Sequence, residues 1–228
     1  MTALASLNQK KHRLTNQLTS HIPAGVAGIS KRVLDLAITL PLIIFLAPLL
    51  ITIALIIGGI DGNPVLYRHI RHGRGGSVFT LYKFRTMVPA SDELLADLLA
   101  KDPTAKADWV RFRKLRHDPR VTRLGAFLRK SSLDELPQLF NVLRGEMSLV
   151  GPRPVVTEEL AQFGTAASYY QAAKPGITGL WQISGRNDAD FTTRIELDTA
   201  YVCSWSLSGD IAILAKTVPI VLMAKGAY

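Results

Sequence analysis

Residues 36–60, LAITLPLIIFLAPLLITIALIIGGI, contain no charged side chain and decide where this protein resides. At about 1.5 Å rise per residue, a helix of this length reaches across the roughly 30 Å hydrocarbon core of a bilayer. Helices in the core of soluble proteins are usually shorter and carry a polar face. We therefore predict that this segment inserts into a membrane.

Basic residues flank the segment at both ends, and such residues prefer the cytoplasmic side of a membrane. They are Lys10, Lys11, Arg13, Lys31 and Arg32 before it, and Arg68, Arg71, Arg74, Lys83 and Arg85 after it. A spanning helix carries one group across, whereas a hairpin that returns through the same leaflet leaves both inside. Pro41 and Pro48 can break the helix, because proline lacks an amide hydrogen and clashes with the preceding turn. The charges favour a re-entrant helix–break–helix over residues 31–62, and a spanning helix with a proline kink stays open.

Length and composition restrict the rest of the chain. It has 228 residues and a formal net charge of +9, which suits nucleic acid, an anionic membrane surface or a phosphorylated substrate. Cys203 is the single cysteine, so an internal disulfide is excluded and a reducing cytoplasm fits. Residues 1–30 are interpreted as a polar N-terminal tail, and residues 63–228 as one domain at the membrane surface.

The pattern after residue 62 predicts an α+β domain, rich in helices, with a small β-hairpin. Strands are expected at residues 65–67 and 78–84, on either side of a glycine-rich turn at residues 73–76. Helices are expected near residues 91–102, 105–116, 158–171 and 190–204. The helix at 105–116 mixes aromatic and basic residues, which fits an interfacial amphipathic helix and equally a solvated basic face. Residues 211–223 fit an interfacial or core helix, and Gly176 is placed for the positive φ of a type II turn.

Asp134 and Glu135 are adjacent carboxylates just before Pro137, a residue that favours the first turn of a helix. The positive end of a helix dipole would help to keep both ionised. An ionised aspartate can attack phosphorus, and a neighbouring carboxylate can hold Mg²⁺. The alternative is a capping box, Ser132-x-x-Glu135, in which the same residues only start the helix. The local pattern alone favours the capping box.

Several cations complete a candidate site. The prolines within residues 151–154 fix the backbone around Arg153, which suits bidentate binding of phosphate. Lys83 and Arg85 would share one face of a strand, and Arg129 lies shortly before the carboxylates. Each of these side chains is otherwise an ordinary solvent-facing residue. If they converge beside the carboxylates, they form a Mg²⁺-assisted phosphoryl-transfer site.

Short blocks of sequence follow one another from residue 83 onward. They are KFRTM at 83–87, DPRVTRLG at 118–125, SLDELPQLFNV at 132–142, MSLVGPRP at 147–154, PGITG at 175–179, WQ at 181–182 and GR at 185–186. Each block alone is a weak signal. Together, in this order, they resemble the bacterial sugar transferases, the monotopic phosphoglycosyl transferases. The resemblance extends from about residue 31 to the C-terminus and is to the short members that prime exopolysaccharide synthesis.

The resemblance implies that a hexose-1-phosphate, galactose or glucose, moves from a UDP-sugar to undecaprenyl phosphate and that UMP is released. In the family the aspartate that matches Asp134 is the nucleophile and forms a covalent phosphosugar intermediate. The position of Glu135 is associated with Mg²⁺. The positions of Lys83, Arg129 and Arg153 bind phosphate groups.

The resemblance also implies that Arg186 contacts the nucleotide and that the membrane helix breaks at Pro48. The family commonly has serine before that proline, where this chain has Ala47. The family's location is the bacterial inner membrane, with the catalytic domain on the cytoplasmic face, in contact with the lipid bilayer. The sequence leaves the identity of the sugar and a homo-oligomeric state open.

The sequence leaves two rival functions open. A glycosyltransferase would move only the sugar and release UDP, and the block at residues 132–142 argues against it. A non-catalytic membrane adaptor would use the basic surface to recruit other components, and the presence of Asp134 and Glu135 argues against that. Binding of nucleic acid is the weakest alternative, because the basic residues adjoin a membrane segment and the sequence has no recognised reading motif.

Overall fold

The computed structural model describes residues 22–112, 115, 118–184 and 191–222, and all statements below concern this part of the chain. Its elements are η1 (Ala24–Ala27), α2 (Ile29–Ile60), β1 (Leu66–His72), η2 (Arg74–Gly76), β2 (Val78–Phe84), α3 (Ser91–Lys101), α4 (Pro103–Phe112), α5 (Arg123–Lys130), η3 (Leu133–Glu135), α6 (Gln138–Arg144), β3 (Ser148–Val150), α7 (Thr157–Ala161), η4 (Gly164–Ala166), α8 (Ala167–Ala172), β4 (Gly176–Thr178), α9 (Leu180–Ile183), α10 (Phe191–Cys203) and α11 (Leu207–Leu222). Strands β1 and β2 pair antiparallel, and β3 and β4 pair parallel. The prediction of a helix-rich α+β domain with a small hairpin is confirmed.

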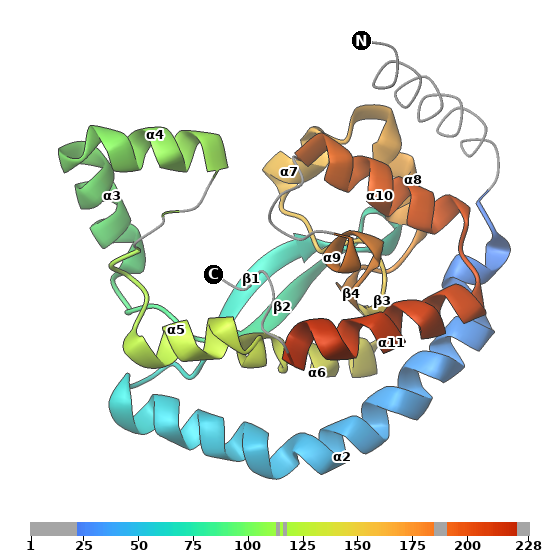
Figure 1. Ribbon diagram of the computed structural model, residues 1–228, viewed down its shortest axis with the longest axis horizontal. Helices are drawn as coiled ribbons and strands as arrows, with labels where there is room; N and C mark the ends of the chain where they lie inside the picture. The colour runs from blue at the N-terminus through green and yellow to red at the C-terminus, as the bar shows by residue number, and fades with distance from the viewer. Residues whose placement is uncertain (1–21, 113–114, 116–117, 185–190, 223–228) are drawn as a thin grey trace.

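Helix α2 is long and apolar enough to cross a membrane and runs unbroken through Pro41 and Pro48. Figure 1 shows α2 as a curved helix, with the other described elements on its concave side and both of its ends turned toward that side. Prolines inside a helix are a common cause of such bending. The expected break therefore takes the form of a curve in a continuous helix, and re-entry into one leaflet stays a prediction.

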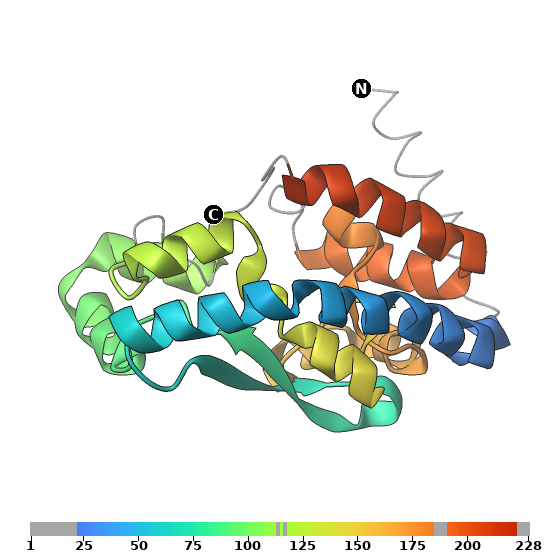
Figure 2. The same ribbon diagram turned by 90° about the horizontal axis from the view of Figure 1, so that it is seen from below.

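The two faces of α2 differ in burial. Its inner face is buried and changes from polar to apolar along the helix: Lys31, Asp35 and Thr39 are followed by Leu50, Ile53 and Ile57. Its outer face exposes large apolar side chains, such as Ile44 at 74% and Phe45 at 80%. Figure 2 shows the hairpin and α6 on one side of α2 and α5 and α11 on the other. An exposed apolar surface of this size is unusual in water and fits contact with lipid.

The β1–β2 hairpin lies at the centre of the molecule. Its register pairs Tyr67 with Lys83, and β1 extends to His72, well beyond the strand expected at residues 65–67. Asn141 of α6 fixes the hairpin from one side, because its amide accepts from the Tyr82 backbone N–H at 3.1 Å and donates to the Thr80 carbonyl at 2.7 Å. The main core lies between this hairpin, α6, β3 and α10.

The structure bears on three other expectations. The helix expected near residues 91–102 is α3, which begins at Ser91 with Ala90 at its N-cap, and α3 and α4 form an arm that projects from the body (Figure 1). The helix expected at residues 158–171 is divided into α7 and α8, since Gly164 adopts a positive φ of 53° between them. The type II turn at Gly176 is wrong: this residue lies in β4, where a Cβ would come within 2.1 Å of the Gly151 backbone nitrogen. Glycine is needed there for close backbone packing.

Candidate active site

Asp134 lies in the short turn η3, between α5 and α6. The turn begins at Ser132, the only non-glycine residue with a positive φ (57°) in the described part of the chain. Such a conformation costs roughly 1–3 kcal/mol and is often found at functional sites. The Ser132 side chain makes no capping hydrogen bond to a described residue, so the capping-box alternative is wrong. A capping box therefore does not account for the two carboxylates.

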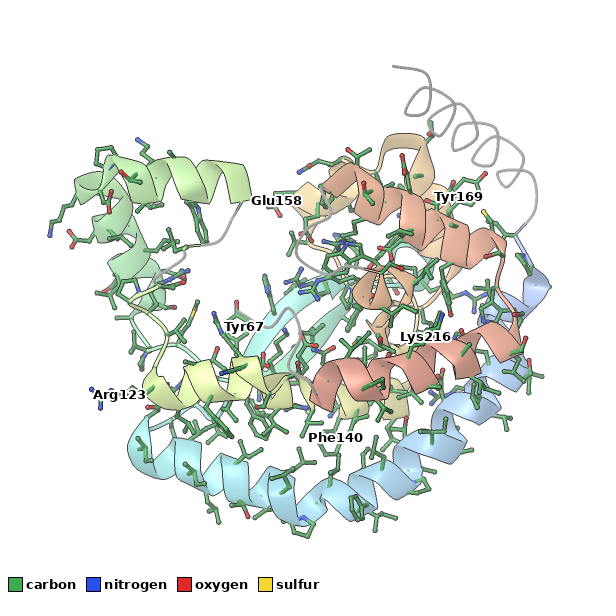
Figure 3. The ribbon with its side chains drawn as sticks, viewed as in Figure 1. Tyr67, Arg123, Phe140, Glu158, Tyr169 and Lys216 are labelled. Carbon is green, nitrogen blue, oxygen red and sulfur yellow. The ribbon has the colours of Figure 1, made fainter. Side chains whose placement is uncertain are left out.

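Lys83, at the end of β2, reaches both carboxylates. Its Nζ lies 2.6 Å from Glu135 Oε1 and 3.8 Å from Asp134 Oδ2. Asp134 is 8% exposed, and its burial raises the pKa of the carboxyl to about 6; Lys83 acts against this rise, Glu135 adds to it, and Arg129 again opposes it. At neutral pH this carboxyl is mostly ionised. Tyr67, which Figure 3 labels near the centre of the molecule, is the cross-strand partner of Lys83.

Arg129 is placed by the packing of α5 against the segment after β2. Its Nε donates to Thr86 Oγ1 at 2.8 Å. One turn earlier, Gly125 lies against the same residue: a Cβ there would come within 2.1 Å of the Thr86 carbonyl oxygen. Because residues four apart share a helix face, the missing side chain of Gly125 lets α5 approach closely enough for Arg129 to bind Thr86. In this position the positive charge of Arg129 opposes the rise in the pKa of Asp134.

The candidate Mg²⁺ ligands of the site are the carboxylates of Asp134 and Glu135. Among the described residues, no group of three or more histidine, cysteine, aspartate or glutamate side chains could hold a metal ion. Mg²⁺ commonly binds through one or two carboxylates together with substrate phosphates. The oxygens of Glu135 and Asp134 fit that mode, with Glu135 shared with Lys83.

Arg153 lies in a different cluster from Lys83 and Arg129. Its Cζ is 5.6 Å from the centre of the Trp181 ring, and Arg194 of α10 lies over the same ring at 5.4 Å. The loop that carries Arg153 leaves β3 at Gly151, which packs directly against the backbone of β4. The structure therefore separates the predicted phosphate-binding cations into two groups.

Arg85 is turned toward the end of the membrane helix. Strand β2 ends at Phe84, so the alternation that would place Arg85 beside Lys83 stops one residue early. The Arg85 side chain is buried, and its Nη2 donates to the carbonyl oxygens of Asp61 and Gly62 at 2.6 and 2.7 Å. It thus stabilises the C-terminal end of α2, and a contact with substrate stays a prediction. Arg186 lies outside the described residues.

Sequence reasoning assigned no role in the site to Arg71, Trp181 or Arg194. Arg71 follows the short strand predicted at residues 65–67, and only a longer β1 places it on the same face as Lys83. Trp181 belongs to the motif at residues 181–182, which by itself does not indicate that the ring lies against Arg153. Arg194 and Asp198 are spaced i, i+4 on α10, a signal that could have indicated an ion pair.

Comparison with known proteins identifies the family of this chain. The family model described as Bacterial sugar transferase matches residues 26–224. An undecaprenyl-phosphate galactose phosphotransferase of Salmonella typhimurium is 52% identical over 198 residues, 87% of this chain and 41% of that protein. The exopolysaccharide production protein ExoY of Sinorhizobium fredii is 48% identical over 203 residues, 89% of this chain and 90% of that protein.

A third relative is the UDP-glucose:undecaprenyl-phosphate glucose-1-phosphate transferase of Caulobacter vibrioides, 40% identical over 91% of this chain and 75% of that protein. The chain spans less than half of the Salmonella relative and of the similar proteins from Haemophilus influenzae and Erwinia amylovora, but most of ExoY. The family match covers nearly all of the described residues, including both cationic groups. This chain belongs to the bacterial sugar transferase family.

Proposed function

We propose that the protein transfers a hexose-1-phosphate, galactose or glucose, from a UDP-sugar to undecaprenyl phosphate and releases UMP, as the priming step of exopolysaccharide synthesis. The observation that carries this proposal is the buried Asp134 carboxylate, held on a constrained turn beside Lys83 and Arg129. The names of the Salmonella and Caulobacter relatives supply the substrate class.

In the first step, an Asp134 carboxylate oxygen attacks the phosphorus that bears the sugar. The bond from that phosphorus to the bridging oxygen breaks, a new aspartyl–phosphate bond forms, and UMP leaves with the bridging oxygen. Lys83 holds the Glu135 carboxylate and offsets negative charge beside the reacting phosphate. Arg129, oriented by Thr86, adds a second positive charge that acts on Asp134.

In the second step, a phosphate oxygen of undecaprenyl phosphate attacks the same phosphorus. The aspartyl–phosphate bond breaks, the carboxylate of Asp134 is regenerated, and the sugar leaves on a lipid diphosphate. One nucleophile can thus serve both transfers, which predicts ping-pong kinetics. Mg²⁺ held by Glu135 and Asp134 would supply positive charge to the phosphate oxygens.

The membrane position follows from the lipid acceptor, and we place the domain on the cytoplasmic face of the inner membrane. The exposed apolar face of α2 and the exposed Ile211 and Val218 of α11 support contact with a membrane, and the basic residues that flank α2 favour its cytoplasmic face. Cysteines at Ile29 and Ile60, which are 84% and 72% exposed, would test it in a Cys203→Ser background. With a re-entrant α2, neither cysteine reacts with an impermeant thiol reagent in intact spheroplasts, and both react after lysis. Labelling of one end from outside would contradict re-entry.

The activity test is the nucleotide released from UDP-galactose or UDP-glucose with Mg²⁺ and polyprenyl phosphate. Wild type should release UMP, and Asp134→Asn should lose at least a thousandfold in rate, since the nucleophile is removed. Asp97→Asn, at an exposed position on α3, is the control. Labelled donor without acceptor should also leave a phosphosugar on the peptide that contains Asp134. Release of UDP would indicate a glycosyltransferase, and release of neither nucleotide an adaptor.

A further inference from the structure

Basic side chains from separate elements gather where the membrane helix begins. Arg32 lies in the first turn of α2, Lys174 follows α8, and Arg74 lies in η2 at the tip of the hairpin. Gly145, just after α6, lies between the first two: a Cβ there would stand 3.5 Å from Lys174 Nζ and 3.6 Å from Arg32 Nη2. Because Gly145 has a φ of 83°, which favours glycine, no side chain fills this point. We call Arg32, Lys174 and Arg74 the basic patch.

The charges of the basic patch have no acidic partner in the described part of the chain. There, neither the Lys174 nor the Arg74 side chain forms an ion pair or a hydrogen bond with another residue. Arg32 binds neutral acceptors, because its Nη1 and Nη2 donate to the carbonyl oxygens of Val142 and Leu143 at 2.6 and 2.8 Å. Burial lowers the pKa of Lys174, and the charge of Arg32 lowers it further. Like charges at this separation repel each other, so a bound anion would stabilise the arrangement.

Acidic side chains of the same region are bound elsewhere. Asp35 acts on Lys174 through its charge, but its Oδ1 accepts from the backbone N–H of Leu149 at 2.9 Å. Glu146, the residue after Gly145, accepts from Asn141 Nδ2 at 2.6 Å. These contacts hold the two carboxylates on the α6–β3 side of the fold. The point between the cations is therefore left to an anion from outside the chain.

The position of the basic patch matches the headgroup layer of a membrane that contains α2. Arg32 precedes the uncharged run at residues 36–60 by four residues, about 6 Å along a helix. On the same helix, Val33 and Leu40 are 59% and 46% exposed and offer apolar surface beside the patch. Figure 2 shows the hairpin and α6 together on one side of α2. A phosphate held at the patch can thus have acyl chains that run along α2.

We propose that the basic patch binds the phosphate of one anionic phospholipid of the bilayer. Basic pockets beside membrane helices bind such headgroups, and the apolar surface of α2 favours a lipid over a free phosphate. The site is separate from Asp134: Lys83 lies near the open end of the hairpin and Arg74 at its closed end, with about 17 Å of strand between Val78 and Lys83. The inference goes beyond the proposed function, since it depends on membrane contact of α2 and not on the chemistry of a UDP-sugar. A lipid bound here would attach the closed end of the hairpin to the membrane surface.

The test is native mass spectrometry of the full chain in a neutral detergent, with phosphatidylglycerol or phosphatidylcholine added. Wild type should bind one phosphatidylglycerol roughly fivefold or more tightly than phosphatidylcholine, because only the former has a net charge. Lys174→Gln should raise the dissociation constant of phosphatidylglycerol about fivefold, the effect of one basic residue at a membrane surface. Arg74→Gln, in an exposed turn where misfolding is not expected, should have a similar effect. Lys106→Gln, exposed on α4, is the matched control and should change the constant by less than about twofold.

Four results would overturn the inference. The first two are equal binding of the two lipids and unchanged binding of phosphatidylglycerol in both Lys174→Gln and Arg74→Gln. Displacement of phosphatidylglycerol by millimolar glycerol 3-phosphate would indicate a site for a soluble anion, and displacement by an equal concentration of polyprenyl phosphate would assign the patch to the acceptor. Release of UMP is measured separately on the same preparation. Its absence, with selective binding of phosphatidylglycerol retained, would refute the proposed function alone, so the two failures are distinguishable.

Discussion

A buried ion pair joins the start of the membrane helix to α11. The Nζ of Lys31 lies 2.7 Å from Asp210 Oδ2, and the two side chains are 4% and 0% exposed. The same carboxylate accepts hydrogen bonds from the Tyr201 hydroxyl at 2.8 Å and the Trp205 indole N–H at 3.0 Å. Removal of Lys31 would leave a buried charge with neutral donors only.

We predict that Lys31→Met destabilises the protein by about 3 kcal/mol. Loss of one partner of a buried pair usually costs about 3–5 kcal/mol, and the remaining donors from Tyr201 and Trp205 place this case at the lower end. In a domain of this size, about 3 kcal/mol lowers the melting temperature by roughly 6–12 °C. The assay is thermal unfolding in nanodiscs, followed by tryptophan fluorescence at one fixed scan rate, because unfolding of such proteins is often irreversible.

Two further variants make this prediction sharp. Lys101→Met breaks the ion pair with Asp97, whose partners are 73% and 58% exposed, and should shift the melting temperature by no more than about 3 °C. The double variant Lys31→Met/Asp210→Asn should melt higher than Lys31→Met alone, since the unpaired charge is gone. A Lys31→Met shift no larger than that of the control, or a double variant that melts lower than the single, would refute the reasoning.

Two other predictions concern packing and pH. Gly151→Ala should severely reduce stability and UMP release, because its Cβ would come within 2.3 Å of the Lys174 carbonyl oxygen; Gly59→Ala, whose Cβ meets no described atom within 4 Å, should melt within about 2 °C of wild type. Burial raises the pKa of Asp198 from 3.8 to about 7, against the charges of Arg194 and Arg153. Between about pH 4 and pH 7, the native carboxyl keeps a proton that the unfolded carboxyl has lost. The contribution of this residue to the free energy of unfolding therefore falls as the pH rises through that range. Asp198→Asn should lose less stability than wild type between pH 5 and pH 8 in thermal melts; an equal loss would contradict this.

The elements with a strong local signal could be predicted from sequence. The membrane helix follows from an uninterrupted apolar run, and strand β2 was predicted with its observed limits, residues 78–84. Strand β1 was predicted too short, because the basic residues from Arg68 to His72 resemble a loop and become a strand only by pairing with β2. The error at Gly176 has a similar cause: the contact that requires glycine comes from Gly151, far away in sequence.

In the candidate site, too, the sequence indicated some contacts and not others. The proximity of Lys83 to the two carboxylates was expected, and it is confirmed by short distances. The association of Arg153 with Arg71 and Arg194 depends on three elements that meet only in the folded chain, so the sequence could not indicate it. Alternation along a strand also failed as a guide to Arg85, because the strand ends at the preceding residue.

Arg85 is one of the polar side chains that attach α2 to the rest of the fold. Lipid tails are as apolar as the side chains of α2, so apolar packing in a bilayer does little to select one orientation of this helix. Polar contacts can select it, and they lie at both ends: Asp35 accepts from the Leu149 backbone N–H at 2.9 Å, and Arg85 binds the carbonyl oxygens that follow α2. The partners are more than 100 residues from α2 at one end and about 20 at the other. In the proposed membrane position, a helix fixed in this way would keep the hairpin, and with it Lys83, at a constant depth relative to the membrane surface, where the proposed lipid acceptor would arrive.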